Sequence, residues 1–260
     1  MTTNRAIPII NNPAPYIDGL IIKNDPAVTL LNATNKVLYV EAGSTRDSTN
    51  TYDMVLPSEI ALNGLAVGIN GLDTGTIAAN LMYNIFLISD PVNANPTGVM
   101  ASLATTPLMP FGYSAYKQIG FWSTSVANGA NWDLGYITGI SSKRIFNYQD
   151  NQLSTLTGGV IGVTTPVNVS FLTRVPVIEN LICNISVQCI ALAGDSIILR
   201  LFGSDPLSTF STFYMQGTTL ISFFTNIISK LNVTVPTIVL TSDNGNAQIS
   251  VVIQSYEFDL

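Results

Sequence analysis

Apolar and polar residues alternate along much of the chain with a period of two, the pattern of β-strands with one buried face. Near the end of the chain, Ile249, Val251 and Ile253 alternate with residues such as Ser250. Residues 81–88 carry apolar side chains on both faces, which predicts a strand covered on both sides. No stretch sustains a helical period, so the sequence predicts an all-β fold.

Strand-like runs separated by turn formers fill both halves of the chain. In the first half they cover residues 16–23, 27–31, 36–41, 52–56, 60–67, 81–88 and 132–140, with 27–31 and 36–41 expected to pair as a hairpin. In the second half they cover residues 160–163, 167–172, 177–192, 196–202, 210–215, 220–228, 233–240 and 247–258. Residues 220–230 could form a short helix instead. Asn244-Gly245 predicts a hairpin turn before the last strand.

The pattern divides the chain into three parts. Residues 1–15, rich in proline and asparagine, are expected to form an extended arm. Residues 16–145 form a β-rich module, and residues 146–260 a β-sandwich or jelly-roll-like domain, because eight short strands follow one another there. The boundary is expected within residues 141–151, where charged residues and turn formers gather.

Composition adds that the surface is poor in ions. Hydrophobic residues make up 47% of the chain, but charged residues make up 10%, against roughly 25% in an average protein. Neutral polar groups cost less to desolvate than ions, which favours a chain covered by copies of itself or by neighbours. We therefore expect a homo-oligomer.

Charge and hydropathy also limit the partners. The net charge is −6 and the ten Lys and Arg residues are scattered, so no nucleic-acid partner is expected. No apolar run is long enough for a membrane span, and the first residues do not resemble a signal peptide. Synthesis in a host cytoplasm is expected.

The residue inventory restricts the chemistry. The chain contains no histidine, which excludes His-dependent hydrolysis and His-ligated zinc. Ser114-Ala115-Tyr116-Lys117 matches the S-x-x-K of penicillin-recognising enzymes, but strand-like surroundings favour coincidence. A pair of carboxylates for glycoside cleavage stays open in principle. We expect no enzyme, no catalytic residues, no cofactor and no metal.

The two cysteines lie in one predicted strand. Cys183 and Cys189 are six residues apart within 177–192, which at about 3.3 Å per residue separates them by roughly 20 Å. A disulfide needs Cα atoms within about 7 Å. We expect two buried free thiols.

Aromatic residues gather in the second half of the module. These rings are candidates for stacking on a glycan or for a subunit contact, and core packing is the other interpretation. The candidates are Tyr113, Tyr116, Phe121, Trp122 and Trp132.

Residues 16 to about 124 resemble a module found in tail-fibre-type and other structural proteins of tailed phages. The resemblance is carried, in order, by Tyr16-Ile17-Asp18-Gly19-Leu20, Ala42-Gly43, Arg46-Asp47-Ser48-Thr49-Asn50, Gly71-Leu72-Asp73-Thr74-Gly75, Ala79-Asn80, Tyr83, Pro110, Gly112-Tyr113 and Tyr116-Lys117-Gln118-Ile119-Gly120. Phe111 departs from it, because a small residue is more usual at that position. The resemblance implies a structural role in a virion and supplies no catalytic residues.

These observations lead to one expected function with alternatives. We expect a structural component of a tailed-phage virion, such as a tail fibre, spike or tail-associated protein, which self-associates and docks to other virion proteins. By analogy with fibres, a trimer is favoured. The alternatives are a capsid decoration or head-fibre protein, and a glycan-binding module that recognises the host surface.

Overall fold

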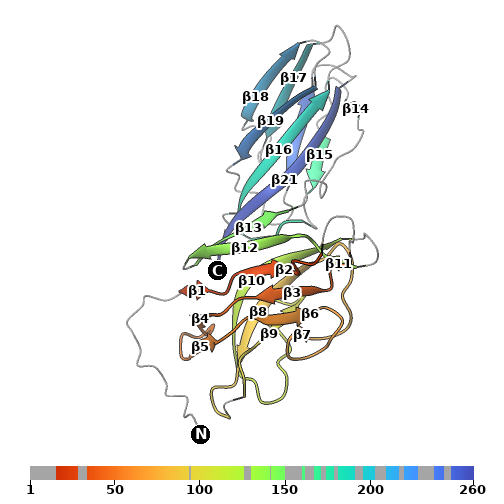
Figure 1. The fold of residues 1–260 in the computed structure, drawn as a ribbon. Helices are drawn as coiled ribbons and strands as arrows, with labels where there is room; N and C mark the ends of the chain where they lie inside the picture. The colour runs from red at the N-terminus through yellow and green to blue at the C-terminus, as the bar shows by residue number, and fades with distance from the viewer. Residues whose placement is uncertain are drawn as a thin grey trace.

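The computed structural model describes residues 16–28, 34–93, 95–125, 130–140, 142–149, 160–161, 167–170, 174–178, 181–190, 196–202, 209–216, 220–227, 237–242 and 247–260. Side chains are described within 16–139, 142–149, 174–184 and 253–260 of that set. The expected arm, residues 1–15, lies outside the described residues. All regular elements of the described residues are strands, which confirms the all-β prediction (Figure 1).

Two sheets enclose the core of the first half of the chain (Figure 1). One is five-stranded, in the order β11-β10-β8-β9-β7, and the other is formed by part of a nine-stranded sheet, in the order β12-β2-β3-β6. The first contains β7 (Gly71–Leu72), β8 (Met82–Ser89), β9 (Gly98–Ser102), β10 (Ala115–Ser125) and β11 (Asn131–Trp132). The second contains β2 (Ile22–Asn24), β3 (Val37–Val40), β6 (Ile60–Asn63) and β12 (Gly135–Ile140).

Burial follows the alternation along these strands. Ile85 and Leu87 of β8 lie in the main core with Leu38 and Val40 of β3. Phe86 and Ile88 point to the other face of the five-stranded sheet, into a second cluster with Met100, Tyr113 and the partly buried Met109 and Tyr116. The prediction that residues 81–88 are covered on both faces is therefore confirmed.

A small third sheet covers one end of this body. Its order is β1-β4-β5, from β1 (Ile17–Gly19), β4 (Gly43–Arg46) and β5 (Asp53–Leu56). Gly19 pairs with Gly43, and a Cβ on Gly43 would lie 2.3 Å from the carbonyl oxygen of Asp18. Only glycine permits so close an approach of two backbones.

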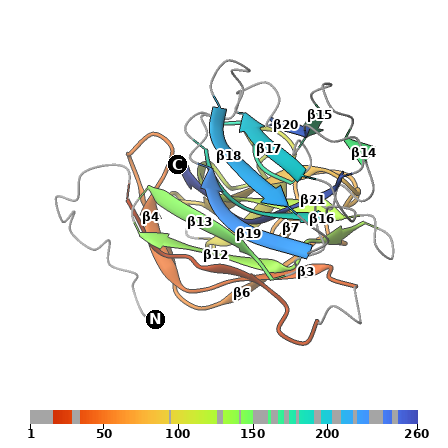
Figure 2. The same ribbon diagram turned by 90° about the horizontal axis from the view of Figure 1, so that it is seen from above.

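The nine-stranded sheet continues from the lower body into the upper part of the molecule (Figures 1 and 2). Its full order is β19-β16-β21-β13-β12-β2-β3-β6, with β14 paired to β21. A four-stranded sheet, β15-β20-β17-β18, lies against its upper end and completes a β-sandwich. These strands are β13 (Lys143–Tyr148), β14 (Val160–Ile161), β15 (Val167–Ser170), β16 (Ile182–Ile190), β17 (Ser196–Phe202), β18 (Thr209–Gln216), β19 (Leu220–Ile227), β20 (Thr237–Ser242) and β21 (Ala247–Asp259).

The segment expected to separate two domains is a strand in this sheet. Strand β13 pairs with β12 on one side and with β21 on the other, and the expected boundary at residue 145 falls within it. Arg144, Phe146 and Tyr148 are buried and alternate with more exposed neighbours, as on a strand with one covered face. The two expected units therefore share one sheet.

Three local predictions are settled by the strand pairing. Strand β3 pairs with β2 on one edge and β6 on the other, so the hairpin expected between residues 27–31 and 36–41 is wrong. Residues 26–28 are not part of a strand, and 29–33 lie outside the described residues. Residues 220–227 form a strand, not a helix. The hairpin expected around Asn244-Gly245 is also wrong, because β20 and β21 belong to different sheets.

Candidate functional site

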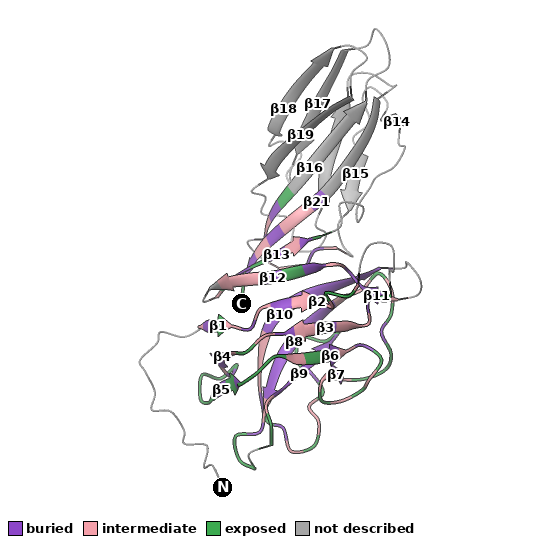
Figure 3. Ribbon diagram, in the orientation of Figure 1, coloured by how far each residue is buried: buried purple, intermediate pink, exposed green. Residues whose placement is uncertain are grey.

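The structure buries four of the five aromatic side chains that the sequence singled out (Figure 3). Trp122 is 0% exposed, Trp132 1%, and Phe121 and Tyr113 each 8%. Tyr116 is half-buried, with its ring edge against Phe86. A buried ring has no face to offer a glycan or a subunit, so both assignments are wrong for these four, and core packing is what the structure shows.

These rings form a chain of contacts that reaches the C-terminal strand. Trp122 meets Phe146 edge-on with ring centroids 4.8 Å apart, and Phe121 meets Phe258 at 5.2 Å. Phe146 in turn stacks on Tyr256 at 5.1 Å with an interplanar angle of 3°. Aromatic pairs in these geometries contribute about 0.5–1.5 kcal/mol each beyond their buried area. The rings therefore fasten β10, β13 and β21 together.

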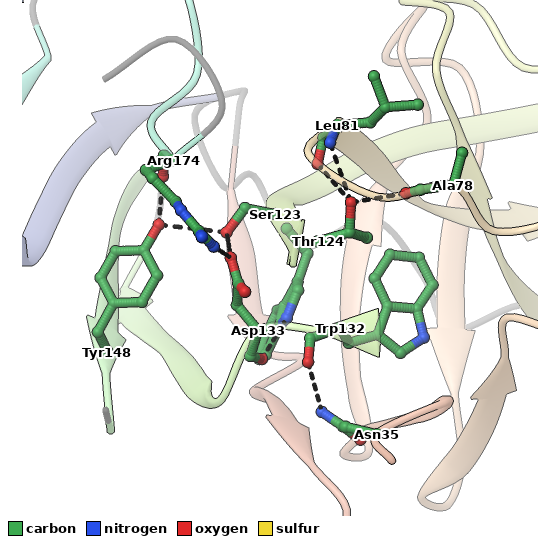
Figure 4. A network of polar contacts seen from close by, with 10 residues as sticks. Asn35, Ala78, Leu81, Ser123, Thr124, Trp132, Asp133, Tyr148 and Arg174 are labelled. Atoms are coloured by element: carbon green, nitrogen blue, oxygen red, sulfur yellow. Dashed lines mark hydrogen bonds and ion pairs between the residues drawn. The ribbon is translucent and has the colours of Figure 1, made fainter. Parts of the chain in front are cut away.

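A buried polar junction lies beside this aromatic core (Figure 4). It consists of Ser123 from β10, Asp133 before β12, Tyr148 from β13 and Arg174 from the segment before β16. Arg174 Nη1 lies 2.6 Å from Asp133 Oδ2, and Ser123 Oγ donates to the same carboxylate oxygen. Tyr148 donates its hydroxyl proton to the Arg174 carbonyl.

The junction is largely buried. The Asp133 side chain is 0% exposed and that of Arg174 is 15% exposed. Asp133 Oδ1 is buried, and no group in the described part of the chain donates to it. Burial, and then the charge of Asp133, raise the pKa of Tyr148, which stays a neutral donor. This arrangement joins residues 174–178 to the lower body.

The sequence did not identify these residues as a group. They are separated by up to 51 positions and none belongs to a motif, so only the folded chain brings Ser123 and Arg174 together. Trp122 was identified, but its role differs from the expected one, because its Nε1 donates to the Asp133 carbonyl at 2.9 Å.

Arg144 is a second buried cation, and it joins β13 to the end of β1. Arg144 is 0% exposed, and its guanidinium donates to the carbonyls of Gly19 at 3.1 Å and Leu20 at 2.6 Å. Both residues have positive φ, 68° and 51°, and Leu20 is an unusual residue in that region. Desolvation lowers the pKa of Arg144 to about 10, which leaves it charged at neutral pH.

The acids within the phage-like motifs hold their own loops. Asp47 accepts hydrogen bonds from the backbone N–H groups of Thr49, Thr51 and Tyr52, the last two at 2.6 and 2.8 Å. Burial alone raises the pKa of Asp47, but these bonds, with that from the Thr49 hydroxyl, lower it overall. The interpretation of residues 42–50 as a turn held by side chains accounts for this loop.

Asp73, in the glycine-rich motif, acts similarly. It accepts from Thr74 N at 2.8 Å, from Ser102 Oγ at 2.6 Å and from Leu108 N at 3.2 Å. It therefore connects the turn after β7 to the end of β9 and to the segment that follows. Gly75 in this loop has a positive φ, 74°, which glycine adopts at little steric cost.

The most exposed large apolar side chains of the described residues gather beside β7 and β9. They lie on three loops, residues 64–70, 91–97 and 103–113, which directly precede β7, precede β9 and follow β9. We call them the apolar rim: Leu65 (67% exposed), Val67 (61%), Val92 (77%), Leu103 (54%), Leu108 (64%) and Phe111 (102%). Clusters of this kind mark interaction sites more often than isolated exposed residues do.

Little points to a metal or membrane site. In the parts of the chain with described coordinates, no three Cys, Asp or Glu side chains are grouped as metal ligands. Nor does that portion contain a helix that is long and apolar enough to cross a membrane. Cys183 is a buried free thiol on β16, and Cys189 follows on the same strand. The prediction of one strand for both cysteines is confirmed, while the Cys189 side chain lies outside the described residues.

Comparison with known proteins gives few matches. No protein-family profile matches the chain, and no curated protein matches it in sequence. Among solved structures, it is similar to an exo-β-1,3-galactanase of Phanerochaete chrysosporium with galactose, at 12% identity over 91% of this chain and 67% of that chain, with a TM-score of 0.22. It is also similar to the structure of infectious bursal disease virus, Gx strain, at 12% identity over 94% and 67%, with a TM-score of 0.24.

The first of these similarities corrects one expectation. The sequence led us to expect that the chain is not an enzyme, yet one of the structures similar to it is a glycosidase. That expectation is therefore withdrawn. At these TM-scores neither structure assigns an activity or a location to this chain.

Proposed function

We propose that this chain is a structural component of a tailed-phage virion, such as a tail fibre, spike or tail-associated protein. It works by self-association and by docking to other virion proteins.

The observation that carries the proposal is the ordered resemblance over residues 16 to about 124, together with what its residues do. Asp47 and Asp73 hold loops, and Gly19 and Gly43 let two strands approach closely. Residues of this kind specify a rigid β scaffold, which is what a virion component requires.

The surface of the chain supports docking. Charged residues are scarce, at 10% of the chain, and the apolar rim is exposed on one side of the lower body. Removing water from contact surfaces of this composition costs little free energy. They fit a protein that works in contact with neighbours.

The alternatives differ in their support. A capsid decoration or head-fibre protein would use the same scaffold and the same rim, and it differs in the neighbour it binds. The glycan-binding module depended on the aromatic candidates, and burial of Phe121, Trp122 and Trp132 removes the rings that would stack on a sugar.

Mass spectrometry of purified particles tests the proposal. Phage particles produced from the genome that encodes this chain should contain it in stoichiometric amounts with the tail proteins. Separated tails and heads, analysed in parallel, distinguish the tail component from the capsid decoration. Absence from both fractions, with the chain present in the lysate, would contradict a virion role.

A further inference from the structure

The six members of the apolar rim are carried by loops that the fold holds together. Ile69 lies against Gly98 at the start of β9, since a Cβ added to Gly98 would be 2.7 Å from Cγ2 of Ile69. Tyr113 donates to the carbonyl of Pro96 at 2.6 Å, which joins the Phe111 loop to the Val92 loop. These contacts hold the Phe111 loop beside the Val92 loop, and the loop of residues 64–70 beside the start of β9.

Phe111 is the most prominent member of the rim. Its side chain is 102% exposed, so it has no packing partner within the described part of its own chain. The next residue, Gly112, has a φ of +88° and sits against Asn95, while Tyr113 is buried in the second core cluster. The loop is thus anchored directly after Phe111, and the Phe111 ring is exposed to solvent.

The loops of the rim carry no charge. Between Glu59 and Lys117 the sequence contains two charged residues, Asp73 and Asp90. Both are occupied: Asp73 by the donors described above, and Asp90 by the N–H groups of Val92 and Asn93 at 3.1 and 2.9 Å. The three rim loops therefore contain no charged residue, and the charged carboxylate of Asp90 beside them is 3% exposed.

We propose that the apolar rim is the surface through which one copy of this chain binds a second copy. The chain carries a net charge of −6, so most contacts between two copies bring like charges together. A face with few exposed acids reduces this repulsion, because in a symmetric contact both partners present the same patch. The large exposed apolar side chains supply the burial that association needs.

This inference rests on the proposed function, since self-association is the means by which the virion component works. It adds the surface and the partner. A different virion protein as the occupant of the rim is the competing outcome of the test.

The test compares a rim variant with a matched control in the full-length chain. Phe111→Ser with Leu108→Ser removes two rim members, and Val55→Ser removes an apolar side chain that is 45% exposed on β5, a strand of the β1-β4-β5 sheet, which carries no rim member. Sedimentation velocity over a concentration series gives the dissociation constant of each protein. Circular dichroism and the fluorescence of the buried Trp122 and Trp132 verify that the variants fold.

We expect the wild-type chain to self-associate at micromolar concentrations. The rim variant should raise the dissociation constant at least about 100-fold. The dissociation constant of Val55→Ser should stay within about threefold of the wild-type value. A monomeric wild type, an unaffected rim variant, or an equal loss in Val55→Ser would each overturn the inference.

Particles separate this inference from the proposed function. A monomeric chain that enters particles, with a rim variant that does not, assigns the rim to another virion protein and overturns the inference alone. A chain that self-associates through the rim but is absent from particles leaves the inference in place and overturns the proposed function.

Discussion

Replacing Arg174 by methionine removes the cation of the buried junction while keeping most of its apolar volume. Asp133 would then keep its hydrogen bond from Ser123 but lose the guanidinium 2.6 Å from Oδ2. Its Oδ1 already lacks a donor within the described chain, so the carboxylate has no other compensation there. Breaking a buried pair in this way costs about 3–5 kcal/mol.

We expect the lower part of that range, because the Arg174 side chain is 15% exposed and water reaches one side of the pair. A loss of about 3 kcal/mol corresponds to a fall in melting temperature of roughly 6–12 °C in a chain of this size. Urea unfolding followed by tryptophan fluorescence measures it directly. Both tryptophans border the junction, since Trp122 donates to the Asp133 carbonyl and Trp132 precedes that residue.

Lys143→Met provides the matched control. It also removes a cation from an ion pair, with Glu257 at 3.2 Å, but the Lys143 side chain is 68% exposed. Exposed pairs contribute about 0–1 kcal/mol. In the double variant Asp133→Asn with Arg174→Met the cost should fall at least about 1 kcal/mol short of the sum of the single changes. Equal losses in Arg174→Met and Lys143→Met would refute the assignment of a buried ion pair.

Three further predictions concern the backbone, pH and the thiols. Gly139→Ala should lower the free energy of urea unfolding by at least about 3 kcal/mol, since the φ of Gly139 is +137° and the new Cβ would lie 2.2 Å from the backbone oxygen of Lys143. Gly75→Ala is the control: its φ is +74° but the space around it is open, so it should cost about 1 kcal/mol. Asp47→Asn should cost about 1–2 kcal/mol at pH 7. The folded pKa of Asp47 lies below its usual value, so the stabilisation by its carboxylate is present above about pH 4 and is lost as pH falls through the folded pKa. The free energies of unfolding of the variant and the wild type should therefore converge in acid. A difference that stays constant with pH would contradict this. Burial raises the pKa of Cys183 to about 12, so peptide mapping after alkylation at mild alkaline pH should find it unmodified until denaturant is added.

The strands could be predicted from the sequence because their signal is local. Alternation located β21, and the largely apolar run at 81–88, interrupted by Asn84, located β8 with both faces covered. The pairing of strands could not be predicted in the same way. Residues 27–31 are more apolar than Ile22–Asn24, yet β2 is the strand that pairs, because Ile22 has Val40 on one side and Ile137 on the other.

Turn chemistry shows the same division between local and distant information. Asn244-Gly245 indicates a chain reversal, but it does not say which sheet receives the next strand, and here β20 and β21 enter different sheets. The junction was missed for a similar reason, since Asp133 and Arg174 are 41 residues apart and neither belongs to a motif. The rim had a readable signal: the scarcity of charge between Glu59 and Lys117.

The last strand has a mechanical consequence for any assembly that contains this chain. Residues of β21 pair with β16 along Gln248–Glu257 and with β13 along Ser255–Asp259, so one continuous strand crosses from the upper sandwich to the lower body. A pull on the upper sandwich along β21 would load many backbone hydrogen bonds at once, in shear, before any could separate. Force applied at one end would thus reach the other through hydrogen-bonded backbone, and not through a compliant linker.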